Sequence, residues 1–197
     1  MPRSDDLQFF LDELKTSIAK CQPAEKIQSA TTLAFQRLET LGEENWLRKH
    51  SEAPVTAWLE QAIKTAKAGP TCKLAEALEN LAPRLLWQRR MDRPSIHPKW
   101  PNSHANSVII GDAGLESRND VRIGVSLLAP YTVYPNHQHP PEEVYIALSN
   151  GSWRQNDGFW QTRGAGGLIY NPPNIVHAMK SNSDPLLAIW ILPLSLL

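Results

Sequence analysis

The sequence predicts an α-helical N-terminal region followed by an all-β domain, either a small antiparallel β-barrel or a jelly roll. Apolar residues recur at the spacing of one helix face up to about residue 90. Beyond that point they alternate with other residues, which is typical of strands. Asn150-Gly151 and Asn156-Asp157-Gly158 are turn signals between the later segments. We therefore expect a helical region over residues 1–92 and a β-barrel over residues 93–197.

The first two helices are predicted from apolar stripes and from residues that suit helix ends. Ser4 is a candidate N-cap, and Asp5 and Asp6 suit the positive end of the first helix. The apolar stripe of that helix consists of Leu7, Phe10, Leu11, Leu14 and Ile18. The second helix is predicted over residues 24–41, and Gly42 is expected to end it.

Two further helices are expected before residue 90. Pro54 suits the first turn of the third helix, and Gly69-Pro70 breaks that helix. The fourth helix carries an apolar stripe of Leu74, Leu78, Leu81 and Leu85. The four helices together account for the predicted N-terminal region.

A polar, proline-rich segment over residues 93–106 predicts a surface linker rather than a regular element. His50, His97 and His104 are expected at the surface or as capping residues. After the linker, three segments alternate with the strand period of two. These segments are 121–127, 144–148 and 187–192.

The bulk composition excludes several classes of protein. Lysine and arginine together number 20, as do aspartate and glutamate, so no net charge favours nucleic acid or an anionic membrane. No run approaches the roughly 20 apolar residues of a membrane span, and the first residues lack the apolar core of a signal peptide. Cys21 and Cys72 form neither a disulfide framework nor a zinc knuckle. We expect a reduced, cytoplasmic protein, whose helical region offers a surface for a homodimer.

A group of metal-binding residue types is the most informative feature of the second half. His137 and His139 are followed by Glu143 and Tyr145, and His177 comes from a separate predicted strand. Alternate residues of a strand share a face, so each of the first two pairs can face one site. Imidazoles with one carboxylate are typical of a catalytic divalent transition metal site. The donors accept Zn, Fe, Mn, Ni or Co, and we expect one such ion.

These residues stand in two motifs that resemble those of the cupin superfamily. The first motif contains His137, His139, Glu143 and Gly151, and the second contains Gly166, Pro172, Asn174 and His177. One extra residue precedes Gly151, and Asn174 stands where the second motif usually has glycine. Asparagine can also adopt a positive φ. The resemblance implies a jelly-roll β-barrel of the cupin type, a fold that hosts many chemistries.

A narrower resemblance links the chain to the cupin-type dimethylsulfoniopropionate lyases. It rests on Tyr134-Pro-x-His-x-His-Pro-x-Glu-Glu-x-Tyr145, a Trp153 strand, Pro-Pro-x-x-x-His-Ala-Met179 and Pro185-Leu-Leu-Ala. Members of this family also carry a helical region before the barrel. The resemblance implies a metal held by His139, Glu143 and His177, with His137 and Tyr145 at or next to it. It also implies that Tyr134 lines the substrate site.

The reaction that this resemblance implies is a β-elimination that yields dimethyl sulfide and acrylate. A base must remove a weakly acidic proton next to a carboxylate, and a bound metal can stabilise the charge that develops. A free tyrosine has a pKa near ~10, so a nearby cation has to lower it. We expect Tyr145 to be the base and Tyr134 to be the second candidate or an orienting donor. An aromatic face can attract the sulfonium, with Trp190 and Trp160 as candidates besides their roles in core packing.

Two other functions stay open on the sequence alone. The chain could be a cupin metalloenzyme that acts on another small carboxylate, as a dioxygenase or an isomerase. It could also be a cupin that binds a small ligand without catalysis. A small-molecule partner is expected in every case, and nucleic acid and membrane are not.

Overall fold

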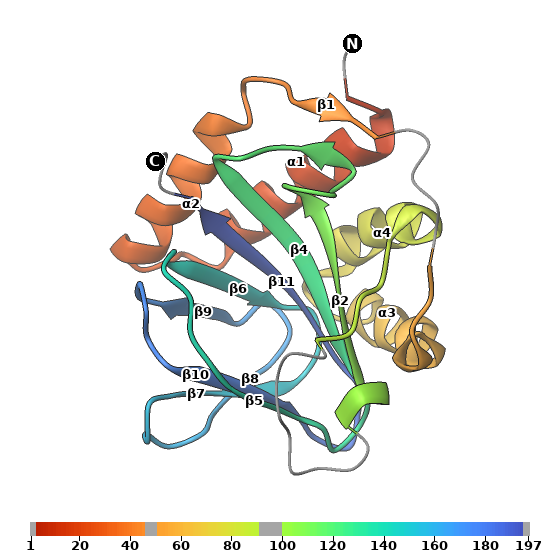
Figure 1. Ribbon diagram of the computed structural model, residues 1–197, viewed down its shortest axis with the longest axis vertical. Coiled ribbons are helices and arrows are strands. Elements are labelled where there is room, and N and C mark those ends of the chain that lie inside the picture. Colours follow the sequence, from red (N-terminus) through yellow and green to blue (C-terminus); the bar gives the residue numbers. More distant parts are fainter. Residues whose placement is uncertain (1–2, 46–50, 91–99, 195–197) are drawn as a thin grey trace.

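The computed structural model describes residues 3–45, 51–90 and 100–194. Helices pack on a large β-sheet, and a smaller sheet lies apart from them (Figure 1). The helical elements are α1 (Asp5–Lys20), α2 (Glu25–Arg37), η1 (Pro54–Trp58), α3 (Leu59–Lys67), α4 (Cys72–Leu81), η2 (Ala82–Arg84) and η3 (Trp100–Asn102). The strands are β1 (Glu43–Glu44), β2 (His104–Ile110), β3 (Glu116–Ser117), β4 (Val121–Leu128), β5 (Val133–His137), β6 (Glu143–Ala147), β7 (Gly151–Gln155), β8 (Gln161–Arg163), β9 (Leu168–Asn171), β10 (His177–Ser181) and β11 (Leu186–Pro193).

The start of α1 differs from the prediction in one respect. Asp5 and Asp6 lie in its first turn as expected, but the Ser4 side chain makes no capping hydrogen bond. The Ser4 hydroxyl donates instead to Glu44, with 2.6 Å between Oγ and Oε1. Arg84 binds the same carboxylate oxygen at 2.9 Å. The predicted capping role of Ser4 is therefore wrong, because its hydroxyl is taken by a charged acceptor, which forms the stronger hydrogen bond.

The second helix is shorter than predicted. α2 ends at Arg37 rather than at residue 41, and the Arg118 guanidinium donates to the carbonyl of Arg37 at 2.8 Å. Gly42 does not end the helix. A Cβ at Gly42 would stand 2.5 Å from the carbonyl oxygen of Ser117. Glycine is therefore required there because the chain passes close to β3.

The third and fourth helices agree with the prediction. Pro54 begins the 3-10 turn η1, which leads directly into α3. The helix ends before Gly69-Pro70, and α4 follows. Leu85, the last residue of the predicted apolar stripe, lies beyond η2 and is fully buried. The apolar faces of these helices pack in one hydrophobic cluster with residues of the larger sheet.

The strands form two sheets. The larger has the order β1-β3-β2-β4-β11-β6-β9, and the smaller has the order β5-β10-β7-β8. All pairs are antiparallel except the short β2–β3 pair. The predicted linker is wrong for residues 100–102, which form η3, and for residues 104–106, because β2 begins at His104, opposite Leu128 of β4. The rest of that linker up to residue 99 lies outside the described residues, as do His50 and His97.

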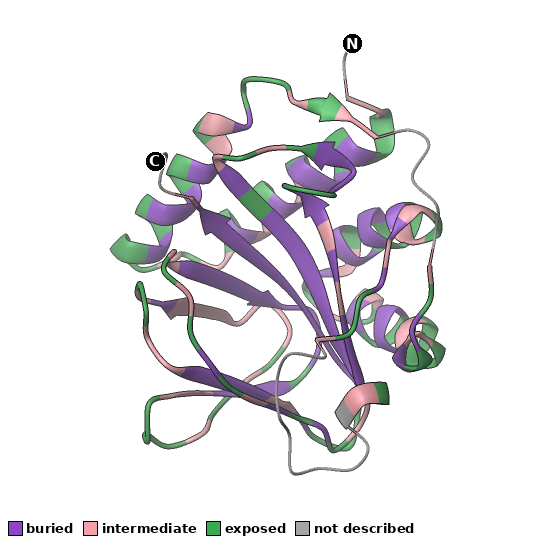
Figure 2. Ribbon diagram, viewed as in Figure 1, coloured by how far each residue is buried: buried purple, intermediate pink, exposed green. Residues whose placement is uncertain are grey.

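The central strands of the larger sheet are buried on both faces (Figure 2). Leu187, Ile189 and Ile191 belong to the cluster that includes the helices. Ala188, Trp190 and Leu192 belong to a second cluster, together with residues of the smaller sheet. The predicted alternation is present, and each face of β11 meets a different layer.

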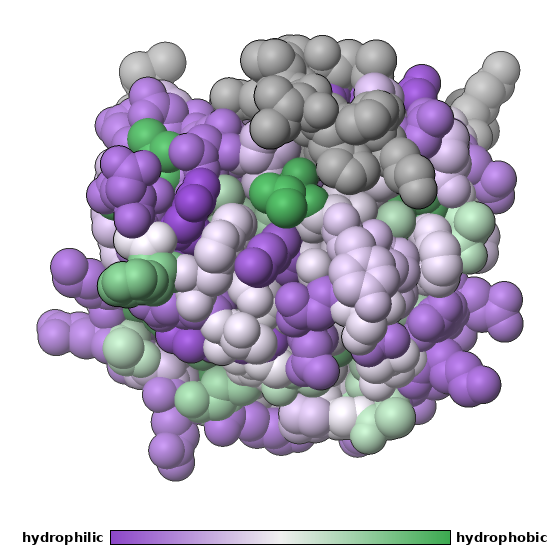
Figure 3. Space-filling view, turned by 90° about the horizontal axis from the view of Figure 1, so that it is seen from below, coloured by the Kyte–Doolittle hydropathy of each residue, from purple (hydrophilic) through white to green (hydrophobic). Residues whose placement is uncertain are grey.

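The outer surface has a mixed character. Seen from below, the described part of the molecule shows hydrophilic and hydrophobic side chains interspersed, without a large continuous apolar patch (Figure 3). Among the described helices, none is both long and apolar enough to cross a membrane.

Candidate metal centre

Two imidazoles and one carboxylate converge beside a cavity, and two of the three, His139 and Glu143, line that cavity. The candidate ligand atoms of His139, Glu143 and His177 all lie within 4.8 Å of one another. Glu143 Oε2 is 3.2 Å from Nε2 of His177 and 3.5 Å from Nε2 of His139. Glu143 and His177 are buried, and His139 is half-buried. Their donor atoms are of the kinds that divalent transition metals take in proteins.

Each member of this set occupies a strand end or the turn beyond one. Glu143 begins β6, and His177 begins β10. His139 lies past the end of β5 at His137, so the expected shared strand face of the two histidines is wrong. A turn holds His139 instead, because the backbone N–H of Asn174 donates to its carbonyl at 2.9 Å. Asn174 has a φ of 59°, the positive φ that asparagine was expected to supply in the second motif.

The three histidines of the site are each anchored to the backbone in the same way. In each ring, Nδ1 lies within hydrogen-bonding distance of a carbonyl oxygen two residues away in the sequence. For His137, His139 and His177 these acceptors are Pro135, Pro141 and Ile175, at 3.0, 2.9 and 2.9 Å. A carbonyl only accepts, so the neutral ring carries its proton on Nδ1 and a lone pair on Nε2. Metal-binding histidines in proteins are commonly oriented in this way.

One contact tests whether these residues fit a metal ion. His177 Nε2 is buried, and no described residue gives it a hydrogen bond. It nevertheless lies 3.2 Å from the carboxylate oxygen Glu143 Oε2. With the ring proton on Nδ1, two lone pairs face each other there. A cation among the donors removes this repulsion, so the residues fit a divalent metal.

The Glu143 carboxylate is held from behind by two amides. Asn171 of β9 is almost fully buried and donates from Nδ2 to Glu143 Oε2 at 3.0 Å. Gln155 of β7 donates to Asn171 Oδ1 at 2.9 Å and to the carbonyl of Tyr170 at 2.6 Å. Gln155 therefore fixes which end of the Asn171 amide faces the carboxylate. The sequence analysis missed both amides. Asn171 is opposite Glu143 only through the pairing of β6 with β9, which the structure shows.

Burial and neighbouring charges set the protonation of the site in the metal-free protein. Burial raises the pKa of Glu143, but the neighbouring imidazoles of His139 and His177 outweigh burial and hold the pKa below its usual range. Burial lowers the pKa of His139, but Glu143 outweighs burial and raises it. Burial, followed by the charge of His177, lowers the pKa of His137 to about 3. His137 is therefore a neutral imidazole at ordinary pH.

The remaining predicted site residues line the same cavity. His137 is not one of the three residues whose ligand atoms cluster, but its ring centroid lies 4.0 Å from that of His177. Tyr134 packs against His137 with 4.7 Å between ring centroids. Tyr145 is buried on β6, and burial together with the charge and hydrogen bond of Glu143 raises its pKa well above the usual value. The phenol of Tyr145 is thus neutral in the metal-free protein.

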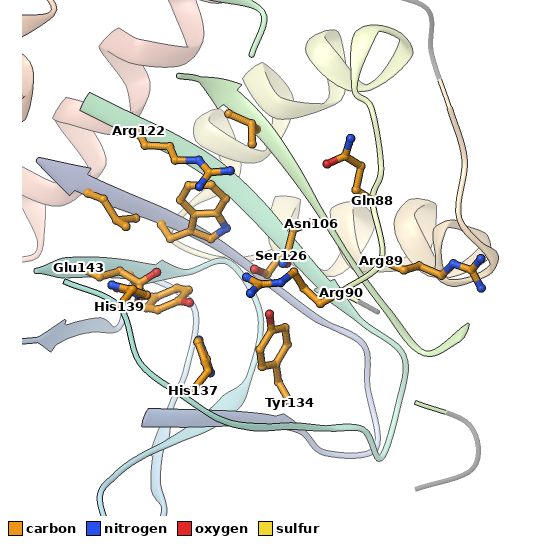
Figure 4. A pocket seen from close by; sticks show the side chains of 14 residues that line it. Gln88, Arg89, Arg90, Asn106, Arg122, Ser126, Tyr134, His137, His139 and Glu143 are labelled. Carbon is orange, nitrogen blue, oxygen red and sulfur yellow. Dashed lines mark ion pairs between the residues drawn. The ribbon is translucent and has the colours of Figure 1, made fainter. Parts of the chain in front are cut away.

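The cavity has a volume of about 150 Å³, below the range of roughly 300–1,000 Å³ that is common for drug-sized ligands. Arg90, Asn106, Arg122 and Ser126 also line it (Figure 4). The sequence analysis missed these four residues. Arg122 and Ser126 share one parity along β4, and this polar side of the alternation lines the cavity. The alternation along residues 121–127 was the sequence signal that could have identified Arg122 and Ser126 as cavity residues.

Three further expectations can be compared with the structure. Trp190 lines the cavity, and its ring lies 5.6 Å from the guanidinium of Arg122. Trp160 is not among the cavity-lining residues and lies against Arg154 and Lys180, at 4.8 and 4.6 Å. The expectation of a surface role for His104 is wrong. His104 is fully buried, and its ring accepts a hydrogen bond from the Arg90 backbone at 2.8 Å.

A family model described as dimethylsulfoniopropionate (DMSP) lyase matches residues 27–188 of the chain. A protein of Cereibacter sphaeroides, provisionally named dimethylsulfoniopropionate lyase DddL, is 32% identical over 129 residues. The match covers 65% of this chain and 53% of that relative, so the chain spans about half of the relative's length.

Two solved structures show the fold of the chain. The DMSP lyase DddQ from Ruegeria pomeroyi superimposes with a TM-score of 0.74 at 18% identity, over 98% of this chain and 94% of that one. A chain from the crystal structures of the DMSP lyases RdDddP and RnDddQII superimposes with a TM-score of 0.70 at 20% identity. That match covers 96% of this chain and 93% of the other.

Proposed function

The chain belongs to the DMSP lyase family, and from this we propose that it cleaves DMSP to dimethyl sulfide and acrylate. The observation that carries the proposal is the placement of Tyr145 beside Glu143. The candidate base therefore lines one small cavity together with the candidate ligands His139 and Glu143.

The reaction is a β-elimination that needs no oxidant or reductant. A base removes one proton from the carbon next to the carboxylate. The electron pair left behind forms the carbon–carbon double bond, and the bond from the β-carbon to sulfur breaks. Dimethyl sulfide leaves as a neutral molecule with the electrons of that bond, and acrylate remains.

We propose that His139, Glu143 and His177 hold one divalent transition metal ion, which can be Zn, Fe, Mn, Ni or Co. His137 is the candidate for a further ligand or a neighbour of the ion. When bound, the ion supplies positive charge that stabilises a developing anion and lowers the pKa of nearby acids. The Nδ1 anchors of the imidazoles support this role, because they leave each Nε2 available.

We propose Tyr145 as the general base. Its phenol is buried and neutral in the metal-free protein, so it can act only after a nearby positive charge lowers its pKa. The charge of Arg90 already acts in that direction. Tyr134, at 5.6 Å between ring centroids from His104, is the second candidate and can orient the substrate.

Headspace gas chromatography of dimethyl sulfide tests the proposal. Protein loaded with one divalent metal at a time is incubated with DMSP, and acrylate is measured in parallel. Tyr145→Phe is expected to lower turnover by about 10²- to 10⁴-fold while metal content is unchanged. Tyr131→Phe is the matched control, because Tyr131 is 74% exposed. Normal turnover by Tyr145→Phe would remove Tyr145 from the role of base.

One observation supports a second candidate function. Two imidazoles and one carboxylate, the set that clusters here, is also the set typical of oxygen-activating Fe(II) enzymes. A dioxygenase would consume oxygen with a small carboxylate and would stop under anaerobic conditions. A lyase releases dimethyl sulfide equally well with and without oxygen.

A further inference from the structure

Three arginines, Arg89, Arg90 and Arg122, are among the residues that line the cavity beside the candidate metal ligands. Arg122 comes from β4, and Arg90 is the last residue of the described segment 51–90. Figure 4 shows the Arg90 side chain directed into the cavity near Ser126 and Tyr134, whereas its neighbour Arg89 points away. Arg89 binds Asn102 Oδ1 at 2.9 Å instead. Two consecutive arginines thus have opposite environments.

The backbone around Arg90 is fixed by β2. Gln88 and Asn106 exchange two backbone hydrogen bonds of 2.8 and 2.9 Å. The backbone N–H of Arg90 donates to Nε2 of the buried His104 at 2.8 Å. Because the segment is extended, adjacent side chains point to opposite sides. Arg90 is therefore placed in the cavity by contacts of the main chain.

Arg122 lines the same cavity from β4. The residue is exposed as a whole, but its guanidinium is partly covered because it lies over the ring of Trp190. Burial, and then the charge of Arg90, lower the pKa of Arg122, and Asp112 offsets part of this effect. Two like charges that face one small cavity attract an anion into it. The buried carboxylate of Glu143 lines the same cavity.

We propose that Arg90 and Arg122 form the anion-binding end of the cavity and take the carboxylate of a short-chain carboxylic acid substrate. Guanidinium groups pair with carboxylates through charge-assisted hydrogen bonds and can do so with two parallel bonds. The same charges repel a sulfonium. A substrate with both groups is thereby oriented with its sulfonium directed away from Arg90 and Arg122. This inference deepens the proposed lyase function and rests on it for the identity of the substrate.

Calorimetric titration of the metal-loaded protein with propionate tests the anion site directly. Propionamide, which has the same shape without the charge, is the control ligand. We expect Arg90→Gln and Arg122→Gln each to weaken propionate binding by about 10- to 100-fold, as for loss of a hydrogen bond to a charged group. Arg89→Gln is the matched control and is expected to bind propionate as the wild type does. Arg90→Lys keeps the charge and should recover part of the affinity.

Kinetics with DMSP provide a second readout. Loss of carboxylate binding should raise KM in both glutamine variants, and kcat should change less than KM. Wild-type propionate affinity in Arg90→Gln and Arg122→Gln, or equal binding of propionamide and propionate, would overturn the inference. Arginine-dependent propionate binding by a protein that releases no dimethyl sulfide would support the anion site and refute the lyase function.

Discussion

Replacement of Asn171 by alanine removes the amide that donates to the Glu143 carboxylate at 3.0 Å. Glu143 and Asn171 are both buried, so water does not readily replace the lost donor. A hydrogen bond to a charged group contributes about 1.5–3 kcal/mol, which corresponds to about 10- to 100-fold in a dissociation constant. We therefore expect Asn171→Ala to weaken metal binding by that factor.

A graded series separates orientation of the ligand from general damage. Gln155→Ala keeps the Asn171 amide that donates to Glu143. It removes the second amide, which donates to Asn171 Oδ1 at 2.9 Å and fixes that side chain. A neutral hydrogen bond contributes about 0.5–1.5 kcal/mol, so the expected loss is about 2- to 10-fold. Asn119→Ala, at an exposed turn, should leave affinity unchanged.

Competition with a chromogenic chelator measures the metal affinity of each variant, and the visible spectrum of the Co(II) form reports the ligand geometry. Thermal unfolding of the metal-free proteins shows whether a variant is folded. A folded Asn171→Ala protein with wild-type metal affinity and an unchanged Co(II) spectrum would refute the positioning role of Asn171.

Three more outcomes follow from the structure. Removal of metal with a strong chelator should abolish dimethyl sulfide release, and one divalent metal should restore it; full activity in metal-free protein would contradict the proposed site. Gly124→Ala places a Cβ 2.2 Å from the Trp190 ring, so urea unfolding should show a loss of about 1–3 kcal/mol, and an unchanged midpoint would argue against this contact. Glu116→Ala leaves the guanidinium of Arg3 without its buried partner and should cost about 3–5 kcal/mol. For that variant, a loss below about 1 kcal/mol in the same assay would show that solvent replaces the ion pair.

Much of the fold was predictable because its signals are local. Helix stripes, Pro54 and Gly69-Pro70 depend on residues close in the sequence, and the structure agrees with them. The failures involve distant partners. The Ser4 hydroxyl binds Glu44 instead of capping its helix. The carbonyl of Arg37, the last residue of α2, accepts a hydrogen bond from Arg118. Neither partner can be identified from the sequence around the helix end. The division at residues 92 and 93 stays a prediction.

The candidate site shows the same contrast between local and distant information. Glu143 and His177 were found from residue type and motif, and the structure brings them together with His139. The position of His139 was predicted for the wrong reason, because a turn rather than strand parity places it. Arg90 could not be found at all, since it reaches the cavity only because its segment pairs with β2.

The backbone anchors of the imidazoles have a consequence for the maturation of the protein. Each acceptor lies two residues from its histidine, so ring orientation is decided as the local chain folds, before any ion arrives. At the proposed metal site, binding of an ion therefore does not have to orient these rings. Nitrogen and oxygen donors of this kind follow the general affinity order of the divalent metals. The donor set of the proposed site therefore does not select one ion by itself, and the supply of divalent ions to the folded chain is expected to decide which one binds.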